Sequence, residues 1–148
     1  MRVSTRVEYG VLALIDIALN SENQSSVSAV DISERQGISK KYLEQILPLL
    51  KQAGLIKAQK GLGGGYYLSC NSDKVTVSDV LNALDNSILE EMEYSPGSGT
   101  KELARAVNDN LWGQINERLT GFAQSLSLSE LIRKCREQTS DGWDMYVI

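Results

Sequence analysis

A cluster of glycines between two short β-forming segments constrains the fold of this chain most strongly. Residues 57–68 read Lys-Ala-Gln-Lys-Gly-Leu-Gly-Gly-Gly-Tyr-Tyr-Leu, and four of the chain's twelve glycines lie within positions 61–65. Leu55-Ile56 precede the cluster and Tyr66-Tyr67-Leu68 follow it, so the pattern predicts a β-hairpin with a glycine-rich tip. Nucleotide-binding glycine loops lead into a helix instead. Lys60 at the tip favours an approach to phosphates, and a purely structural hairpin is the alternative.

Helical segments are predicted immediately before this hairpin. Apolar spacing predicts a first helix over residues 4–19, a second over residues 28–36 and a third that Ser39 caps and that reaches residue 53. Gly37 ends the second helix, and the short turn to Ser39 gives the pair the form of a helix-turn-helix. Pro48 lies inside the third helix, where we expect a bend. A helix-turn-helix followed by a hairpin predicts a winged helix, with the glycine-rich tip as the wing.

The start of the third helix is a candidate site for DNA. Ser39, Lys40 and Lys41 place donors and positive charge at a helix N-terminus, which suits phosphates, and polar groups in the first turns can reach base edges. The net charge of the whole chain is −4, yet residues 35–60 carry six cations and only Glu44 as an acid. The local field rather than the total charge attracts a polyanion. A solvated basic face is the alternative interpretation of this segment.

A helical region follows the wing. We expect a helix over residues 78–86, a polar loop over 87–100, a long helix over 101–125, a last helix that Ser127 or Ser129 caps and that ends near residue 138, and a tail over 139–148. The winged helix therefore spans residues 1–86 and the dimerisation region residues 101–138. The long helix carries an apolar stripe at four-residue spacing, and we expect the stripe to form a dimer contact that matches a two-fold symmetric operator. Packing against the winged helix of the same chain is the alternative. The members of this stripe are Leu103, Val107, Leu111, Ile115 and Leu119.

Composition excludes several classes of function. The chain has 148 residues, of which 42% are hydrophobic, and no apolar run is long enough to span a membrane, so we expect a cytoplasmic protein. It has no histidine, which removes the commonest general base and most zinc sites. The two cysteines, Cys70 and Cys135, form no paired motif. We therefore expect neither an enzyme nor a metal site.

The chain resembles the Rrf-two type winged-helix repressors, which include an iron–sulfur-cluster regulator and a cysteine-metabolism regulator. The likeness covers nearly the whole chain. It rests on the opening Met1-Arg2-Val3-Ser4-Thr5 with Tyr9-Gly10, on Ser39-x-x-Tyr42-Leu43-Glu44-Gln45, on Ala53-Gly54-Leu55-Ile56 and on Lys60-Gly61-x-x-Gly64-Gly65-Tyr66-x-Leu68. The fold that it implies is mostly α with a small β-hairpin, namely a winged helix-turn-helix with a long dimerisation helix.

The resemblance also implies where DNA binds. It places Ser39, Tyr42 and Gln45 at the major groove or its phosphates, beside Lys40 and Lys41. It places Thr5 and Arg6 near the DNA backbone. The wing, with Lys60, Gly61, Gly63, Gly64 and Gly65, would enter the minor groove. Many members have arginine where this chain has Lys60, and arginine fits a narrow groove better.

The sensor is where the chain departs from the resemblance. Cluster-binding members carry three cysteines in the loop before the long helix, whereas residues 89–101 contain none. We therefore expect no iron–sulfur cluster and no other cofactor. Cys70 could instead sense oxidation if its thiol is exposed, although a lone cysteine is commonly an inert apolar residue.

The C-terminal tail suggests a partner. Its last residues, Asp144-Met145-Tyr146-Val147-Ile148, resemble the end of the cysteine regulator and also the tail of serine acetyltransferases, which docks in cysteine synthase. A terminal carboxylate beside an apolar side chain is a compact ligand. We expect a dimeric repressor of cysteine or sulfur genes that binds a palindromic operator on double-stranded DNA and holds cysteine synthase through Tyr146, Val147 and Ile148. The alternatives are a repressor of the same fold that senses redox state through Cys70, and a protein-binding adaptor without DNA binding.

Overall fold

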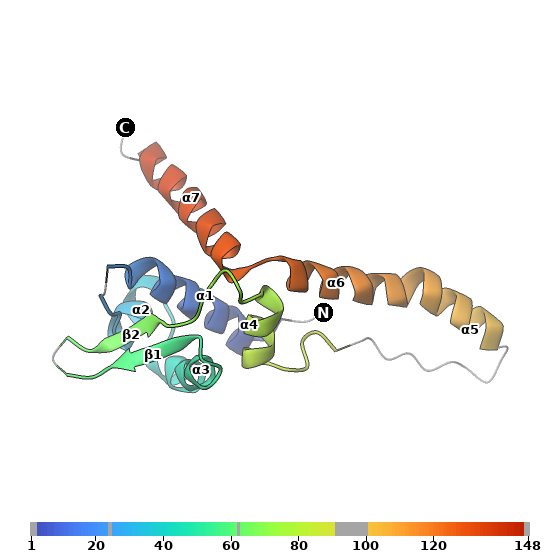
Figure 1. The fold of residues 1–148 in the computed structure, drawn as a ribbon, viewed down its shortest axis with the longest axis horizontal. Coiled ribbons are helices and arrows are strands. Elements are labelled where there is room, and N and C mark those ends of the chain that lie inside the picture. The colour runs from blue at the N-terminus through green and yellow to red at the C-terminus, as the bar shows by residue number, and fades with distance from the viewer. Residues whose placement is uncertain (1–2, 24, 62, 91–100, 147–148) are drawn as a thin grey trace.

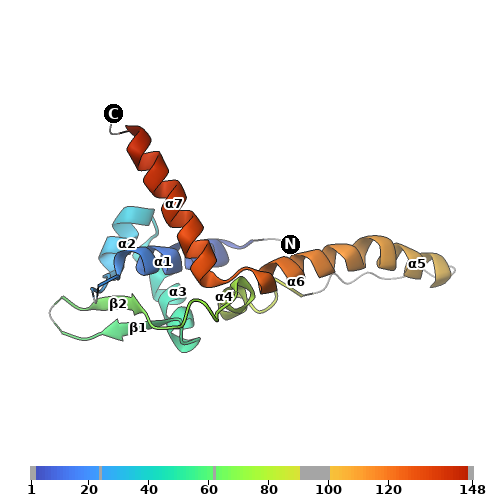
Figure 2. The ribbon, with the colours of Figure 1, turned by 45° about the horizontal axis from the view of Figure 1, so that its top comes forward.

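The fold is that of a winged helix from which a long helix projects. The computed structural model describes residues 3–23, 25–61, 63–90 and 101–146. The N-terminal helices and the hairpin form one compact body. The helices α5 (Lys101–Val107) and α6 (Gly113–Ser125) extend away from it, and α7 (Leu128–Tyr146) rises from the point where α6 meets the body (Figures 1 and 2). This arrangement confirms the predicted fold class.

Each of the first three helices begins after a serine whose hydroxyl accepts a backbone N–H. Ser4 caps α1 (Thr5–Asn20), Ser28 caps α2 (Ala29–Gln36) and Ser39 caps α3 (Lys40–Gln52), with amide-to-hydroxyl distances of 3.3, 3.1 and 3.2 Å. These hydroxyls satisfy amides that have no partner inside the helix. Gly37, with φ of 66°, ends α2 in the left-handed conformation that glycine adopts without steric cost. The predicted helix-turn-helix is therefore confirmed, and α3 runs through Pro48 without interruption.

The hairpin pairs β1 (Ile56–Gln59) with β2 (Gly65–Leu68) in antiparallel register, from Ile56 opposite Leu68 to Gln59 opposite Gly65. Val27 forms a single-residue β-bridge with Tyr66 of β2, in which the two residues exchange backbone hydrogen bonds of 2.8 and 2.7 Å. The segment before α2 is thereby fastened to the wing, and the helix-turn-helix and the hairpin form one unit.

The core lies between α1, α2, α3 and the inner side of the hairpin. Its fully buried side chains come from each of these elements, and the largest are Leu14, Ile17, Ile32, Ile38, Leu43, Ile46, Leu50, Ile56 and Leu128. Leu128, the first residue of α7, joins this core from the far end of the sequence. The α7 helix is therefore anchored to the winged helix at its beginning.

The helix after the wing, α4 (Val77–Leu84), begins one residue earlier and ends two residues earlier than predicted. Thr76 is its cap: the Thr76 hydroxyl accepts the Asp79 amide at 3.2 Å, and the Asp79 carboxylate accepts the Thr76 amide at 2.9 Å. Ser78, the predicted first residue, is buried inside the helix. The reciprocal Thr76–Asp79 capping box explains the correction.

The predicted long helix is one continuous helical rod with a wider turn inside it. It comprises α5 (Lys101–Val107), the π-helical turn η1 (Asn108–Trp112) and α6 (Gly113–Ser125). The Gly113 amide donates to the Asn108 carbonyl, five residues back. A Cβ at position 113 would lie 2.9 Å from that oxygen, so glycine permits the close approach that the wide turn needs.

The last helix differs most from the prediction. The α7 helix (Leu128–Tyr146) runs eight residues past the predicted end near residue 138, so most of the predicted tail is helical. Of the two candidate caps, Ser127 takes the role, because its hydroxyl accepts the Glu130 amide at 3.1 Å. Val147 and Ile148 lie outside the described residues. No helix in the described part of the chain is long and apolar enough to cross a membrane.

Candidate nucleic-acid interface

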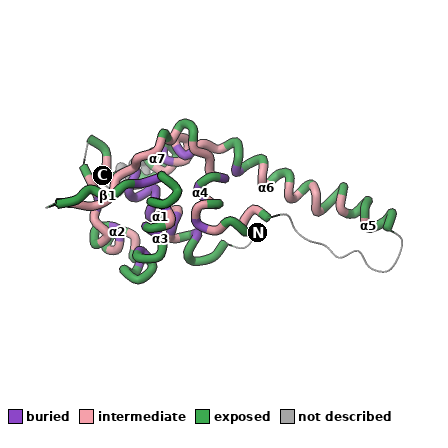
Figure 3. Tube along the Cα trace, turned by 60° about the horizontal axis from the view of Figure 1, so that its bottom comes forward, coloured by how far each residue is buried: buried purple, intermediate pink, exposed green. Residues whose placement is uncertain are grey.

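The outer face of α3 is a polar, exposed surface. Leu43, Ile46, Leu47 and Leu50 are buried on one side of α3, whereas Lys41, Gln45, Pro48 and Gln52 recur at helical spacing on the opposite side, and all four are exposed. Figure 3, which brings this side of the molecule forward, shows exposed residues alternating with buried ones along α3. The predicted residues Lys40, Lys41 and Gln45 are thus free to meet a ligand. Gln52 is absent from the predicted set, although its spacing from Gln45 could have identified it.

Two other predicted residues of α3 have structural contacts as well. The Ser39 hydroxyl is the N-cap of α3, where it accepts the Tyr42 amide. The Tyr42 ring packs edge-on against Tyr9 of α1, with ring centroids 5.4 Å apart and an interplanar angle of 82°. Tyr42 nevertheless keeps 39% of its surface exposed. Ser39 therefore caps α3 and Tyr42 holds α3 against α1, and the sequence does not indicate the role of Tyr9.

The structure requires glycine at four positions of the wing for two different reasons. Gly61 and Gly63 have φ values of 106° and 77°, which side chains disfavour, and open space surrounds them. Gly64 and Gly65 are instead pressed against backbone: a Cβ at Gly64 would lie 2.5 Å from the Gln59 carbonyl oxygen, and one at Gly65 would lie 2.5 Å from that of Val27. Close packing within the protein accounts for Gly64 and Gly65, and the turn accounts for the other two. The glycines by themselves therefore do not indicate contact with phosphates.

The positive charge of the segment is smaller than the sequence suggests, because Arg35 is already paired. Its guanidinium donates to both carboxylate oxygens of Asp16, with Nη2–Oδ1 and Nε–Oδ2 distances of 2.8 and 3.0 Å. The Asp16 side chain is fully buried and also accepts a hydrogen bond from Gln36 at 2.7 Å. The hydrogen bond to Asp16 raises the pKa of Arg35 above its ordinary value. Arg35 thus binds α2 to α1 and is removed from the predicted DNA-binding charge.

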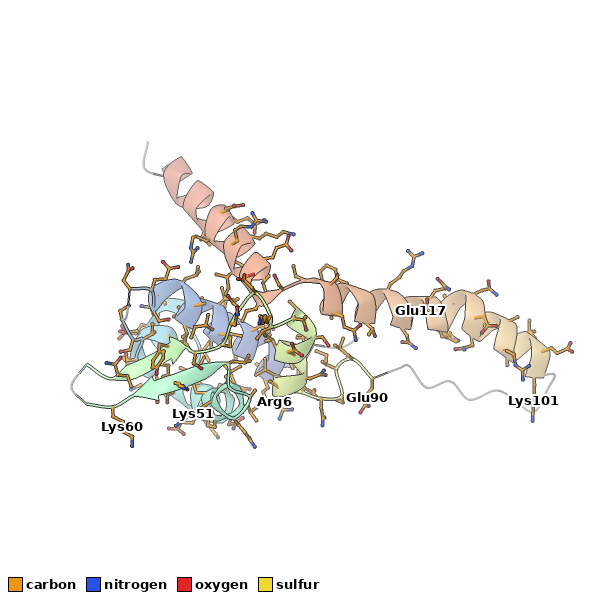
Figure 4. All side chains as sticks on the ribbon, viewed as in Figure 1. Arg6, Lys51, Lys60, Glu90, Lys101 and Glu117 are labelled. Carbon is orange, nitrogen blue, oxygen red and sulfur yellow. The ribbon has the colours of Figure 1, made fainter. Side chains whose placement is uncertain are left out.

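Five lysines remain in residues 35–60 against the single acid Glu44, and the structure spreads them over α3 and the wing. Lys51, Lys57 and Lys60 are exposed, as are Lys40 and Lys41. Figure 4 shows Lys60, Lys51 and Arg6 along one edge of the winged helix, the lower edge in that view. This edge, from the wing across α3 to the start of α1, is a basic strip suited to a nucleic-acid backbone.

Thr5 and Arg6 form the exposed first turn of α1 at the end of this strip. Arg6 lies near Asp85, at the end of α4. The pKa of Asp85 is lowered, chiefly by hydrogen bonds from the Ser87 hydroxyl and amide and to a smaller extent by the charge of Arg6. Arg6 forms no ion pair with any described residue, so its charge remains available to a ligand at this end of the strip.

The stripe on the long helix is exposed where it leaves the body. Leu103, Val107 and Leu111 have 69, 38 and 42% of their surfaces exposed, and Phe122 on α6 has 65%. Ile115 and Leu119 on α6 are half-buried, and α6 is also the part of the rod that contacts α4. The alternative of a fold-back onto the same winged helix is therefore incompatible with α5, which extends away from it in Figures 1 and 2.

The cysteines do not fit an iron–sulfur cluster. Such clusters take four ligands, mostly cysteine thiolates, and this chain has two cysteines and no histidine. Among the described residues no group of three or more histidine, cysteine, aspartate or glutamate side chains is arranged to hold a metal ion. Cys70 and Cys135 are both free and half-buried. Burial raises the pKa of Cys70, which reduces its thiolate fraction and weighs against the redox role considered for it.

Comparison with known proteins agrees with this geometry. Residues 3–134 match the model of the Rrf2 family, described as iron-dependent transcriptional regulators. The transcriptional regulator IscR of Klebsiella pneumoniae is 39% identical over 132 residues, which cover 89% of this chain and 80% of IscR. IscR of an Escherichia coli strain is 38% identical with the same coverage.

Solved structures give the same assignment. CymR of B. subtilis, described as the global cysteine regulator, superposes with a TM-score of 0.76 at 26% identity, over 90% of this chain and 98% of CymR. IscR of T. potens superposes with a TM-score of 0.67 at 30% identity, over 93% of this chain and 90% of IscR. Regulators of the Rrf2 family are DNA-binding proteins without enzymatic activity, so the chain is a DNA-binding transcriptional regulator and not an enzyme. The chain belongs to the Rrf2 family of winged-helix transcriptional regulators.

Proposed function

We propose that two copies of this chain bind a palindromic operator on double-stranded DNA and repress transcription. The observation that carries the proposal is the exposed polar face of α3 at the centre of a basic strip. In this arrangement Lys40, Lys41, Tyr42 and Gln45 face the major groove, and Ser39 lies at its phosphates. Thr5 and Arg6 approach the backbone, and the wing tip with Lys60 enters the minor groove. A regulator of this kind acts in the cytoplasm, where bacterial DNA is found.

The first prediction separates a phosphate contact from a base contact. In Lys60→Ala, the slope of the logarithm of the operator association constant against the logarithm of salt concentration should become less negative by about 0.9, because one fewer phosphate is neutralised. Gln45→Ala should leave that slope unchanged and lower operator affinity by about 1–3 kcal/mol, with loss of discrimination at one base pair. Fluorescence anisotropy at several salt concentrations measures both effects. The control is Lys134→Ala on α7, whose lysine pairs with Glu130 at 3.7 Å. Wild-type binding by both site variants would contradict the placement of the interface.

The second prediction concerns Ser39, which is both helix cap and candidate phosphate neighbour. Ser39→Ala should lower the free energy of unfolding by about 1 kcal/mol, since α3 loses its cap. Ser39→Asp keeps a capping oxygen and should keep the stability, but its negative charge would face DNA phosphates. We therefore expect the aspartate variant to be the stabler of the two and the weaker operator binder, by urea titration and gel shift. If Ser39→Asp bound the operator as tightly as the wild type, Ser39 would not lie at the DNA phosphates.

The regulated genes are proposed to be those of cysteine or sulfur metabolism. The structurally similar CymR is described as a global cysteine regulator, and it is matched along 98% of its length. The IscR proteins are also similar to this chain, but the two cysteines here do not fit an iron–sulfur cluster. A sensor other than a cluster is therefore required, and we propose that cysteine synthase provides it by binding the C-terminal residues Tyr146, Val147 and Ile148.

The third prediction tests this partner. Removal of Val147 and Ile148 should abolish capture of cysteine synthase while operator affinity stays within about twofold of wild type, because both residues lie beyond α7. A pull-down with purified synthase, with and without O-acetylserine, measures the first effect, and a gel shift measures the second. Equal capture by the truncated and the full chain would exclude the tail as the docking segment without affecting the DNA-binding proposal.

A further inference from the structure

A small polar pocket lies where α7 crosses the end of α1 and the root of the wing. Its volume is about 300 Å³, at the lower end of the range for small-molecule sites. Residues from four separate parts of the chain line it: the end of α1, the last residue of β2, the segment before α4, and α7. They are Ala18, Ser21, Glu22, Leu68, Ser72, Ser129, Ile132 and Arg136.

The pocket presents one charge of each sign. Arg136 of α7 and Glu22, which follows α1, form an ion pair across 114 positions of sequence. Both side chains are about half exposed, at 48 and 53%, so the pair is solvated and contributes little to stability. A ligand that carries both charges could therefore take the place of each partner without leaving a buried charge behind.

Three serines line the pocket, and their hydroxyls differ in the hydrogen bonds that they already make: the Ser129 hydroxyl shares one with the Ser127 hydroxyl at 3.1 Å. The Ser72 hydroxyl has no hydrogen-bond partner within the described residues, while the Ser72 carbonyl accepts the Ser129 amide at 3.0 Å. The Ser21 hydroxyl accepts only a long bond of 3.4 Å from the Leu68 amide. Each hydroxyl can donate to a carboxylate or accept from an ammonium group. The polar lining can therefore serve both ends of a doubly charged ligand.

Part of the lining is apolar. Ala18 and Ile132 are buried, with 6 and 7% of their surfaces exposed, and Leu68, the last residue of β2, is half-buried. They offer a short apolar wall beside the charged pair, which suits a small aliphatic side chain.

We propose that this pocket binds a small zwitterionic α-amino acid. The Arg136 guanidinium holds the carboxylate in the two-pronged geometry that arginine favours, the Glu22 carboxylate holds the ammonium group, and Ser72 completes the polar contacts. The ligand joins α7 to the root of β2. Its occupancy thereby couples the C-terminal helix to the position of the wing, which deepens the proposed repressor function, on which it rests, by supplying an effector site.

The experiment titrates L-alanine, L-serine or L-valine into the full chain in the absence of DNA. Isothermal titration calorimetry measures the binding, and amide NMR shifts locate it. L-Alaninamide lacks the carboxylate, and propionate lacks the ammonium group. We expect shifts at Ser21, Ser72 and Ser129 with the small amino acids and at least tenfold weaker binding of the two analogues. Equal binding of a singly charged analogue, or no binding at millimolar concentrations, would overturn the proposal.

Variants then test the two charges. Arg136→Gln and Glu22→Gln should each weaken amino-acid binding at least tenfold and leave the fold intact, because the pair is exposed. The matched control is Arg133→Gln, one turn earlier on the same helix, where the arginine pairs with Glu137 at 2.9 Å outside the pocket. The control should bind like wild type. Unchanged binding by both pocket variants would contradict the assignment, and since no DNA is present, the outcome is independent of operator binding.

Discussion

Replacement of Arg35 by methionine is expected to lower the free energy of unfolding by about 3 kcal/mol, although Arg35 lies on the surface of the helix-turn-helix. The reason is its partner: Asp16 is fully buried, and the Arg35 guanidinium satisfies both of its oxygens. Without Arg35, the buried Asp16 carboxylate would lose its ion-pair partner and retain only Gln36 as a side-chain donor. Urea denaturation at fixed protein concentration measures the loss.

A double variant identifies the buried charge as the cause. The double variant Asp16→Leu/Arg35→Met removes both charges and should unfold within about 1 kcal/mol of wild type, since an apolar pair can replace a buried ion pair. A loss that the double variant shares would show that packing of the arginine stem, rather than the charge, is what matters.

The pair also illustrates what the sequence can predict. Helix starts at Ser4, Ser28 and Ser39 follow from local signals, since each hydroxyl bonds an amide three residues away. The Arg35–Asp16 contact joins residues 19 positions apart, and no local pattern distinguishes it from a free surface charge. The sequence therefore overestimates the charge of the basic segment that is free to meet a ligand, because it counts Arg35.

The wing and the last helix show the same limit. Glycine content predicts the turn, but only the structure reveals that Gly64 and Gly65 face the Gln59 and Val27 carbonyls. The contact with Val27 joins backbones that are distant in sequence. The predicted end of α7 near residue 138 is wrong. The helix continues to Tyr146 through Gly142, although glycine inside a helix costs about 1 kcal/mol relative to alanine.

The apolar stripe of the long helix connects the fold to the proposed dimer. Its members recur every four residues, and a four-residue step overshoots one α-helical turn by about 40°. Over the four steps from Leu103 to Leu119 a regular α-helix would rotate the stripe by about 160° and carry it around the rod. The π-helical turn η1 is wider and rotates less per residue, which turns Ile115 and Leu119 back toward the line of Leu103 and Val107. The stripe is thereby kept nearer to one face, as a single partner helix requires.

Leu111→Asp is therefore expected to dissociate the dimer. Leu111 lies in η1 at the middle of the stripe and is exposed in the single chain. Burial of a leucine stabilises a contact by about 2 kcal/mol, and in a two-fold symmetric dimer the substitution removes this contribution from both copies. The dimer dissociation constant should rise by nearly a thousandfold, which sedimentation equilibrium can measure. Operator affinity should fall with it, because a palindromic site is held by two half-sites.

Arg105→Asp is the control for this variant. It makes a larger charge change on the same rod, two positions from Leu103 and Val107 and hence on the opposite side of α5. It should leave the dimer intact, whereas Gly113→Ala should weaken it moderately, since a Cβ there presses on the Asn108 carbonyl and disfavours the wide turn. A dimer unaffected by Leu111→Asp would place the symmetric contact elsewhere. A dimer weakened by Leu111→Asp but not by Gly113→Ala would keep the stripe as the contact and remove the π-helical turn as the device that aligns it.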